Sequence, residues 1–163
     1  MSSAETTAPA VVLFQKAEVR FRDSTRDRVS TLEVWERVKV LNEEGLTYAQ
    51  LVVPHDRDTR LRTLEARVVQ PDGTIVEVGD DAIFREQVSK TLDDVVTKIA
   101  MPGARVGSIL DVHYVVEWES LAPPFVYSFD KELPTVLSEI TYHKPETLGL
   151  RYWELPTTNL PIQ

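Results

Sequence analysis

The feature that most constrains the fold is an alternation of apolar and polar side chains over residues 110–119. Side chains on a β-strand point in turn to the two faces of a sheet, so a period of two is typical of a strand with one buried and one solvated face. Only Val115 interrupts the polar face. We therefore predict a strand whose core-facing side chains are Leu110, Val112, Tyr114, Val116 and Trp118.

Turn signals separate this strand from others. In Gln70-Pro71-Asp72-Gly73, proline presets φ at the second position and glycine can adopt a positive φ, which predicts a β-hairpin between strands at 64–69 and 74–78. Asn42-Glu43-Glu44-Gly45 predicts a type I turn, ending in a positive φ at Gly45, after a strand at 29–41. We assign architectural roles to four glycines: Gly45, Gly73, Gly103 and Gly107.

Most of the remaining chain also has the character of short strands. β-branched and aromatic runs predict them at 11–21, 46–53, 95–101, 125–129, 136–142 and 148–153. Strands at this density, separated by turns, predict an all-β fold, either an antiparallel sandwich or a barrel. One segment, 81–92, differs because Phe84, Val88 and Leu92 recur every four residues, which indicates a short amphipathic helix.

The length of 163 residues fits one domain. We expect a flexible N-terminus at 1–10, a single domain at 11–154 and a linker-like tail at 155–163. We expect no signal peptide in the given sequence, because no basic region precedes the short apolar run at 10–14. No segment approaches the roughly 20 apolar residues that span a bilayer, and the compartment stays open.

Charge and cysteine content argue against several functions. The 26 acidic and 18 basic residues give a formal charge of -8, which repels the phosphates of nucleic acids. The chain has no cysteine, which excludes a disulfide, a thiol nucleophile and a cysteine-ligated zinc site. We expect no cofactor and no nucleic-acid partner.

Candidate chemistry is confined to a few polar side chains. Asp111, His113 and Glu117 share the polar face of the strand at 110–119, where they could assemble a cation site or an acid–base pair. Alternating charged residues are also typical of a solvated sheet face, and we favour that interpretation. Asp56 and Asp58 have the spacing of calcium ligands but lack the glycine that turns such a loop. We assign no catalytic, cofactor-binding or metal-binding residue.

A possible interaction surface lies near the C-terminus. The strand expected at 148–153 is rich in apolar side chains, and its proline follows only at Pro156, so little protects it from pairing with another chain. We expect contact with a neighbouring domain or self-association there. The residues are Leu148, Leu150, Tyr152 and Trp153. An exposed ring among them would also suit sugar stacking.

Several of these segments resemble one known family. The turns and flanks at 38–45, 66–78 and 101–110, in this order, followed by 133–139, are similar to the bacterial domain of unknown function DUF3857. The resemblance covers roughly 11–153. It implies an immunoglobulin-like β-sandwich that commonly precedes a transglutaminase-like domain in longer, often exported or cell-envelope proteins. The catalytic cysteine, histidine and aspartate belong to that second domain, so the resemblance assigns no catalytic residue here.

These observations lead to one expected function and two alternatives. We expect a non-catalytic accessory or interaction domain of a larger bacterial protein. The first alternative is a small metal-dependent or hydrolytic enzyme using Asp111 and His113. The second is a carbohydrate-binding module using exposed aromatic side chains. A concave pocket would favour the enzyme, a groove lined by rings would favour sugar binding, and an apolar patch would favour a partner protein.

Overall fold

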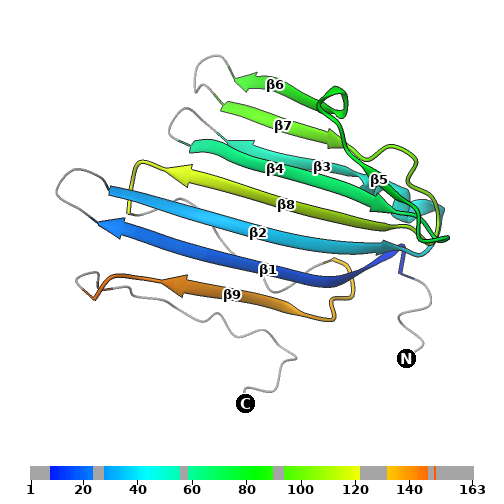
Figure 1. Cartoon of the computed structure of the whole chain (residues 1–163), viewed down its shortest axis with the longest axis horizontal. Helices are drawn as coiled ribbons and strands as arrows, with labels where there is room; N and C mark the ends of the chain where they lie inside the picture. Colours follow the sequence, from blue (N-terminus) through cyan, green and yellow to red (C-terminus); the bar gives the residue numbers. More distant parts are fainter. Residues whose placement is uncertain are drawn as a thin grey trace.

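The computed structural model describes residues 8–23, 28–55, 59–89, 94–121, 132–146 and 149. These residues form two sheets, a large one in the order β5-β4-β8-β2-β1-β9 and a small one in the order β3-β7-β6 (Figure 1). The elements are β1 (Ala10–Asp23), β2 (Arg28–Val40), the 3-10 helix η1 (Glu43–Ala49), β3 (Gln50–His55), β4 (Thr59–Val69), β5 (Ile75–Glu77), the 3-10 helix η2 (Asp80–Ala82), β6 (Ile83–Ser89), β7 (Asp94–Ala100), β8 (Ile109–Trp118) and β9 (Ser138–His143). The predicted all-β, sandwich-like fold and the hairpin between β4 and β5 are confirmed.

The core lies between the sheets, and β8 supplies much of it. Tyr114, one of its five predicted inward side chains, is partly buried against the core. The other four are at most 7% exposed: Leu110, Val112, Val116 and Trp118. The small sheet packs Ile99 of β7 and Val53 of β3 against this layer. The alternation in the sequence therefore identifies the buried face of the central strand.

The position of β8 also determines what stands on the opposite face of the large sheet. β8 pairs antiparallel with β2 on one side and with β4 on the other. In this register Asp111 lies between Arg37 and Arg67, and His113 lies between Trp35 and Glu65. Residues from three distant segments of the chain are thereby brought to one solvent-facing surface.

The large sheet departs from the expected antiparallel arrangement at one edge. β9 pairs parallel with β1, from Gln15 opposite Ser138 to Arg20 opposite His143. Strands joined by a tight turn must run antiparallel, but the first and last described strands have no such constraint.

The segment expected to be one short helix, 81–92, is mostly a strand. The 3-10 helix η2 covers the first two residues of this segment. The strand β6 follows and pairs antiparallel with β7. Phe84 stands opposite Lys98 and is 55% exposed, so it does not form part of a buried helical stripe. A spacing of four residues fits one face of a helix and also, being even, one face of a strand. Leu92 lies outside the described residues.

The strand expected at 46–53 begins later than predicted, at Gln50, because η1 occupies the preceding residues. The side chain of Asn42 caps η1 by accepting a hydrogen bond from the backbone N–H of Gly45 at 3.2 Å. Gly45 does not have the positive φ we expected. Its glycine is required for another reason, because a Cβ there would lie 2.1 Å from the carbonyl oxygen of Pro9.

The turns that carry the family resemblance meet at one end of the sandwich. The Gln70 side chain donates to the carbonyl oxygen of Gly103 at 2.6 Å and accepts from the Ser108 hydroxyl at 3.2 Å. The backbone N–H of Val40 donates to the carbonyl oxygen of Ser108 at 2.9 Å. The three segments therefore form one hydrogen-bonded cluster.

Candidate functional site on the outer face of the large sheet

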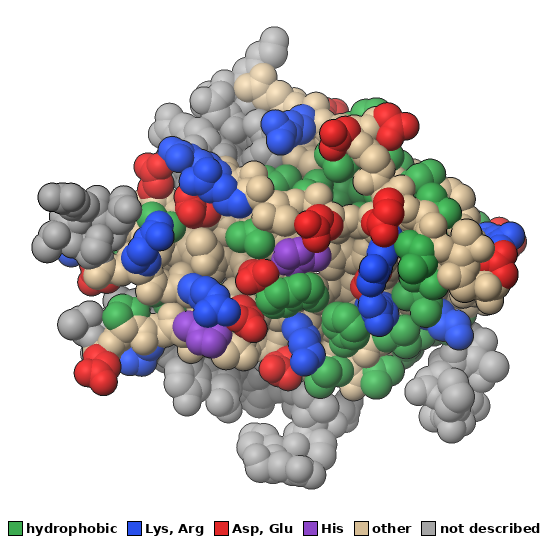
Figure 2. All heavy atoms as spheres, in the orientation of Figure 1, with side chains coloured by type: hydrophobic (Ala, Val, Ile, Leu, Met, Phe, Trp, Pro, Cys, Tyr) green, Lys and Arg blue, Asp and Glu red, His purple; other side chains and the backbone are tan. Residues whose placement is uncertain are grey.

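We call the surface of the large sheet that points away from the core the outer face. Figure 2 shows it with acidic and basic side chains spread over most of its area and with apolar side chains gathered toward one end. The three residues of the predicted polar cluster, Asp111, His113 and Glu117, all stand on this face at alternate positions of β8. Their individual contacts decide whether they form one site.

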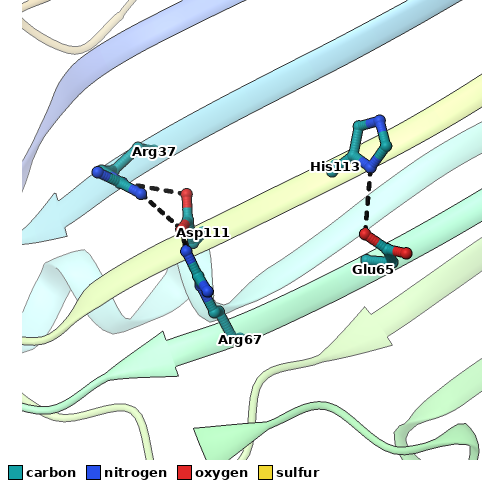
Figure 3. Close-up of polar contacts among 5 residues, drawn as sticks. All are labelled: Arg37, Glu65, Arg67, Asp111 and His113. Atoms are coloured by element: carbon teal, nitrogen blue, oxygen red, sulfur yellow. Dashed lines mark hydrogen bonds and ion pairs between the residues drawn. The ribbon is translucent and has the colours of Figure 1, made fainter. Parts of the chain in front are cut away.

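Asp111 is held between two arginines (Figure 3). Arg37 donates from Nε and Nη2 to its two carboxylate oxygens at 3.1 and 2.7 Å. Arg67 donates from the same two nitrogens to Oδ2 at 3.0 and 2.8 Å. Burial raises the pKa of Asp111, but the hydrogen bonds and positive charges of the two arginines outweigh this effect and leave the pKa below its ordinary value. Asp111 is therefore a fixed anion.

His113 belongs to a separate set of contacts. Its ring stacks on Trp35, with 5.2 Å between centroids and 8° between planes. Its Nε2 lies 2.9 Å from an oxygen of Glu33, and its Nδ1 lies 3.3 Å from an oxygen of Glu65. Both carboxylates accept hydrogen bonds at once only when both ring nitrogens carry protons. Because the carboxylates contact different nitrogens of the ring, they do not converge with His113 on one cation position.

Glu117 makes a third set of contacts, accepting hydrogen bonds from Nε and Nη2 of Arg62. The structure thus places Asp111, His113 and Glu117 on one face but does not bring them together as one site. Within the part of the chain that the structure describes, no three acidic or histidine side chains are grouped so that they could hold a metal ion. Asp56 and Asp58 lie outside that part.

The predicted interaction surface, Leu148, Leu150, Tyr152 and Trp153, also lies outside the described residues. The described helices contain none that is long and apolar enough to cross a membrane.

Sequence reasoning missed the two arginines. Arg37 and Lys39 alternate with the apolar Val38 and Val40, but nothing local identifies the partner of Arg37. Arg37 also places its guanidinium carbon 5.0 Å from the ring centroid of Phe14 in β1, so it contacts both neighbouring strands. A charged residue is expected at this position of the polar face, so only the strand register reveals that Arg37 is paired with Asp111 on the next strand.

Comparison with known proteins supports the fold and the family. The family model described as "Domain of Unknown Function with solved-structure structure (DUF3857)" matches residues 27–162. A crystal structure of a Parabacteroides distasonis protein described as a "putative protease" shares the fold, with a TM-score of 0.75 and 14% sequence identity, and the match covers 89% of this chain and 30% of that chain. This chain therefore spans less than a third of that protein's length.

Two further comparisons add little. Native yeast LTA4 hydrolase gives a TM-score of 0.36 at 15% identity, covering 66% of this chain and 14% of that chain, which does not establish a shared fold. None of the curated proteins compared with the chain matches it.

Proposed function

Because the chain belongs to the DUF3857 family, we propose that it is a non-catalytic accessory domain that contacts a neighbouring domain of a larger bacterial protein. The neighbour we propose is transglutaminase-like, as the sequence resemblance implies. In this proposal the β-sandwich binds and positions, and the neighbouring domain performs the chemistry.

The observation that carries the proposal is the relation between the two chain lengths in the structural comparison. The shared fold covers 89% of this chain but only 30% of the Parabacteroides distasonis protein. In that protein the same fold is thus one part of a longer chain. This supports a role in which the fold serves another domain.

The contacts on the outer face support a non-catalytic role. A general acid must release a proton, and a general base or metal ligand needs an available lone pair. Asp111 already accepts four hydrogen bonds from two arginines, and Glu117 is paired with Arg62. Both ring nitrogens of His113 face carboxylates. These side chains have structural partners that fully account for their arrangement.

The test uses the longest reading frame that contains this chain. We would compare amide hydrolysis and transamidation by the whole protein, by the protein without residues 8–146 and by the present chain alone. We expect activity in the whole protein, an altered rate after the deletion and none in the chain alone. A matched control replaces the nucleophile of the neighbouring domain with alanine, which should abolish all activity.

Two outcomes would contradict the proposal. The first is a reading frame without a second domain. The second is hydrolysis by the present chain alone that is lost in Asp111→Asn or His113→Ala, which would establish the enzyme alternative. Binding between the chain and the separately produced neighbouring domain, measured by calorimetry, gives an independent measure of contact.

A further inference from the structure

One end of the outer face carries a row of four aliphatic side chains and one lysine. The register places Val11, Lys39, Ile109, Val69 and Ile75 next to one another across β1, β2, β8, β4 and β5. Ile75 is 53% exposed, and the other aliphatic members are partly exposed. Figure 2 shows apolar side chains gathered toward this end of the face. We call these five residues the aliphatic row.

The adjacent row across the sheet contains the two arginines that share Asp111. Within the described residues, neither Arg37 nor Arg67 has a second carboxylate partner, so two guanidinium groups are set against one carboxylate. Their hydrogen bonds to Asp111 use Nε and Nη2, which leaves Nη1 of each arginine available. Their side chains are 35% and 43% exposed.

The local charge balance is unusual for this protein. With Lys39 in the aliphatic row and Glu77 opposite Arg67, three cations stand among two anions in these two rows. Further along the outer face, arginines and carboxylates pair one to one, as in Arg62 with Glu117. The whole chain carries a formal charge of -8. Together the two rows therefore carry one net positive charge on an acidic protein, and the arginine pair borders an aliphatic surface.

We propose that the aliphatic row and the arginine pair form a binding surface for an extended segment of a partner protein that carries aliphatic side chains and one carboxylate. The carboxylate binds to Arg37 and Arg67, and the aliphatic side chains cover the row. Asp111 fixes both guanidinium groups in advance, so little side-chain entropy is lost on binding. This inference rests on the proposed function, since it names the surface through which the domain would act.

The charge distribution selects a protein segment as the occupant. A nucleic acid or an anionic membrane presents many negative charges and would be repelled by the rest of this acidic chain. A protein segment can present a single carboxylate to the arginine pair and place apolar side chains beside it. Arg–carboxylate pairing is directional, so it also fixes the register of the segment.

The test begins with a phage-displayed library of short random peptides, selected against the present chain. We expect enriched peptides to combine an aspartate or glutamate with aliphatic residues. The affinity of one such synthetic peptide, measured by fluorescence anisotropy, should fall at least about tenfold in Arg67→Gln and in Ile75→Ser. Arg67→Gln leaves Asp111 paired with Arg37, and Ile75 is half-exposed, so both variants should fold.

Matched controls lie elsewhere on the two sheets. Arg60→Gln removes an exposed arginine near the other end of the outer face, and Val52→Ser removes a half-exposed aliphatic side chain from the small sheet. Both should bind the peptide as the wild type does. Arg67→Lys should bind more weakly than the wild type, because lysine keeps the charge but lacks the planar guanidinium group that can contact Asp111 and a second carboxylate at once.

Other results would overturn the inference. These are the absence of enriched peptides, enriched peptides without acidic residues, or equal binding by wild type and both test variants. Binding to phosphatidylglycerol vesicles that is lost in Arg67→Gln would assign the surface to a membrane instead. A dimer that dissociates in Ile75→Ser would assign it to a second copy. If the neighbouring domain binds wild type and both test variants equally, the surface is wrong but the proposed function stands.

Discussion

The indole of Trp35 and the imidazole of His113 lie nearly parallel on β2 and β8, directly opposite each other in the strand register. Both rings stand on the outer face, away from the core between the sheets. Glu33 and Glu65 contact the two ring nitrogens of His113 from β2 and β4. A single histidine thus connects three strands on the side of the sheet that lacks an apolar core.

This stacked pair leads to the first prediction. In a double-mutant cycle with Trp35→Leu and His113→Gln, we expect a coupling free energy of about 0.5–1.5 kcal/mol, the range for stacked aromatic pairs. Urea denaturation of the four proteins measures it. The control cycle pairs Trp35→Leu with His143→Gln. His143 contacts Glu18 rather than Trp35, so that coupling should be close to zero.

The second prediction concerns the buried face of β8. Val112→Asp should destabilise the fold by more than about 3 kcal/mol, because an unpaired charge would enter the core. Val115→Asp, on the outer face, should cost less than about 1 kcal/mol. Urea denaturation compares the two. A Val112→Asp protein as stable as the wild type would mean that the faces of β8 have been assigned incorrectly.

The third prediction is a pH dependence that originates at Asp111. Its pKa is lower in the folded state than in the unfolded chain, so the arginine contacts stabilise the fold above the unfolded-state value, about 3.9. That stability is lost as the pH falls below this value toward the lower folded-state pKa. We expect Asp111→Asn to be less stable than the wild type at pH 7 by about 1–3 kcal/mol.

Acid denaturation curves check this expectation. The stability difference between wild type and Asp111→Asn should shrink as the solution is acidified below about pH 4. Glu119→Gln is the control, because Glu119 forms an exposed pair with Arg60. Its stability should stay within about 1 kcal/mol of the wild type at every pH. A constant difference for Asp111→Asn across the pH range would count against the assigned role.

The fourth prediction compares two glycines. Gly45→Ala should destabilise the fold more than Gly73→Ala does, because its Cβ would collide with the Pro9 carbonyl oxygen that accepts from the backbone of Leu41. Gly73 has a φ of 87°, and a Cβ added there would meet no other atom within 4 Å. Alanine at this position should therefore lower the free energy of unfolding only by the strain of a left-handed backbone, about 1–2 kcal/mol. Thermal unfolding followed by circular dichroism ranks the two variants, and the reverse order would contradict the packing at Gly45.

The fifth prediction concerns metal binding. Calorimetric titration with Zn²⁺ or Ca²⁺ should give no stoichiometric tight site, because the contacts of Asp111 and His113 are already made to other side chains. His113→Ala is the informative variant. Tight Zn²⁺ binding by the wild type that disappears in this variant would favour the metal-dependent alternative.

Patterns within short segments predicted the buried face of a strand and the position of a turn, because both depend on neighbouring residues. The period of two identified the buried side chains of β8, and the proline and glycine at 71 and 73 identified the hairpin. The short helix expected near 81–92 was wrong over β6, because the even spacing of Phe84 and Val88 is compatible with a strand as well. Pairing with β7, which is a tertiary property, decides between the two.

The site was less predictable for a related reason. Asp111 and His113 could be placed on one polar face, but their partners depend on the register of three strands. Arg37 and Arg67 lie 74 and 44 residues from Asp111 in the sequence. No periodicity within a single strand contains that information. A polar cluster in one strand therefore became three separate sets of contacts in the sheet.

The parallel pairing of β1 with β9 has a consequence for how the chain folds. β1 is synthesised first, but one of its two hydrogen-bonding edges receives its partner only when residues 138–143 become available. Until then a long strand presents unpaired backbone groups, which favours association between unfinished chains. The pairing of β1 with β9 also joins residues that lie far apart in the sequence, and contacts of this kind slow folding. Completion of β9 thus replaces part of the long edge of β1 with a strand of six residues, and a short edge strand offers fewer unpaired backbone groups to another copy.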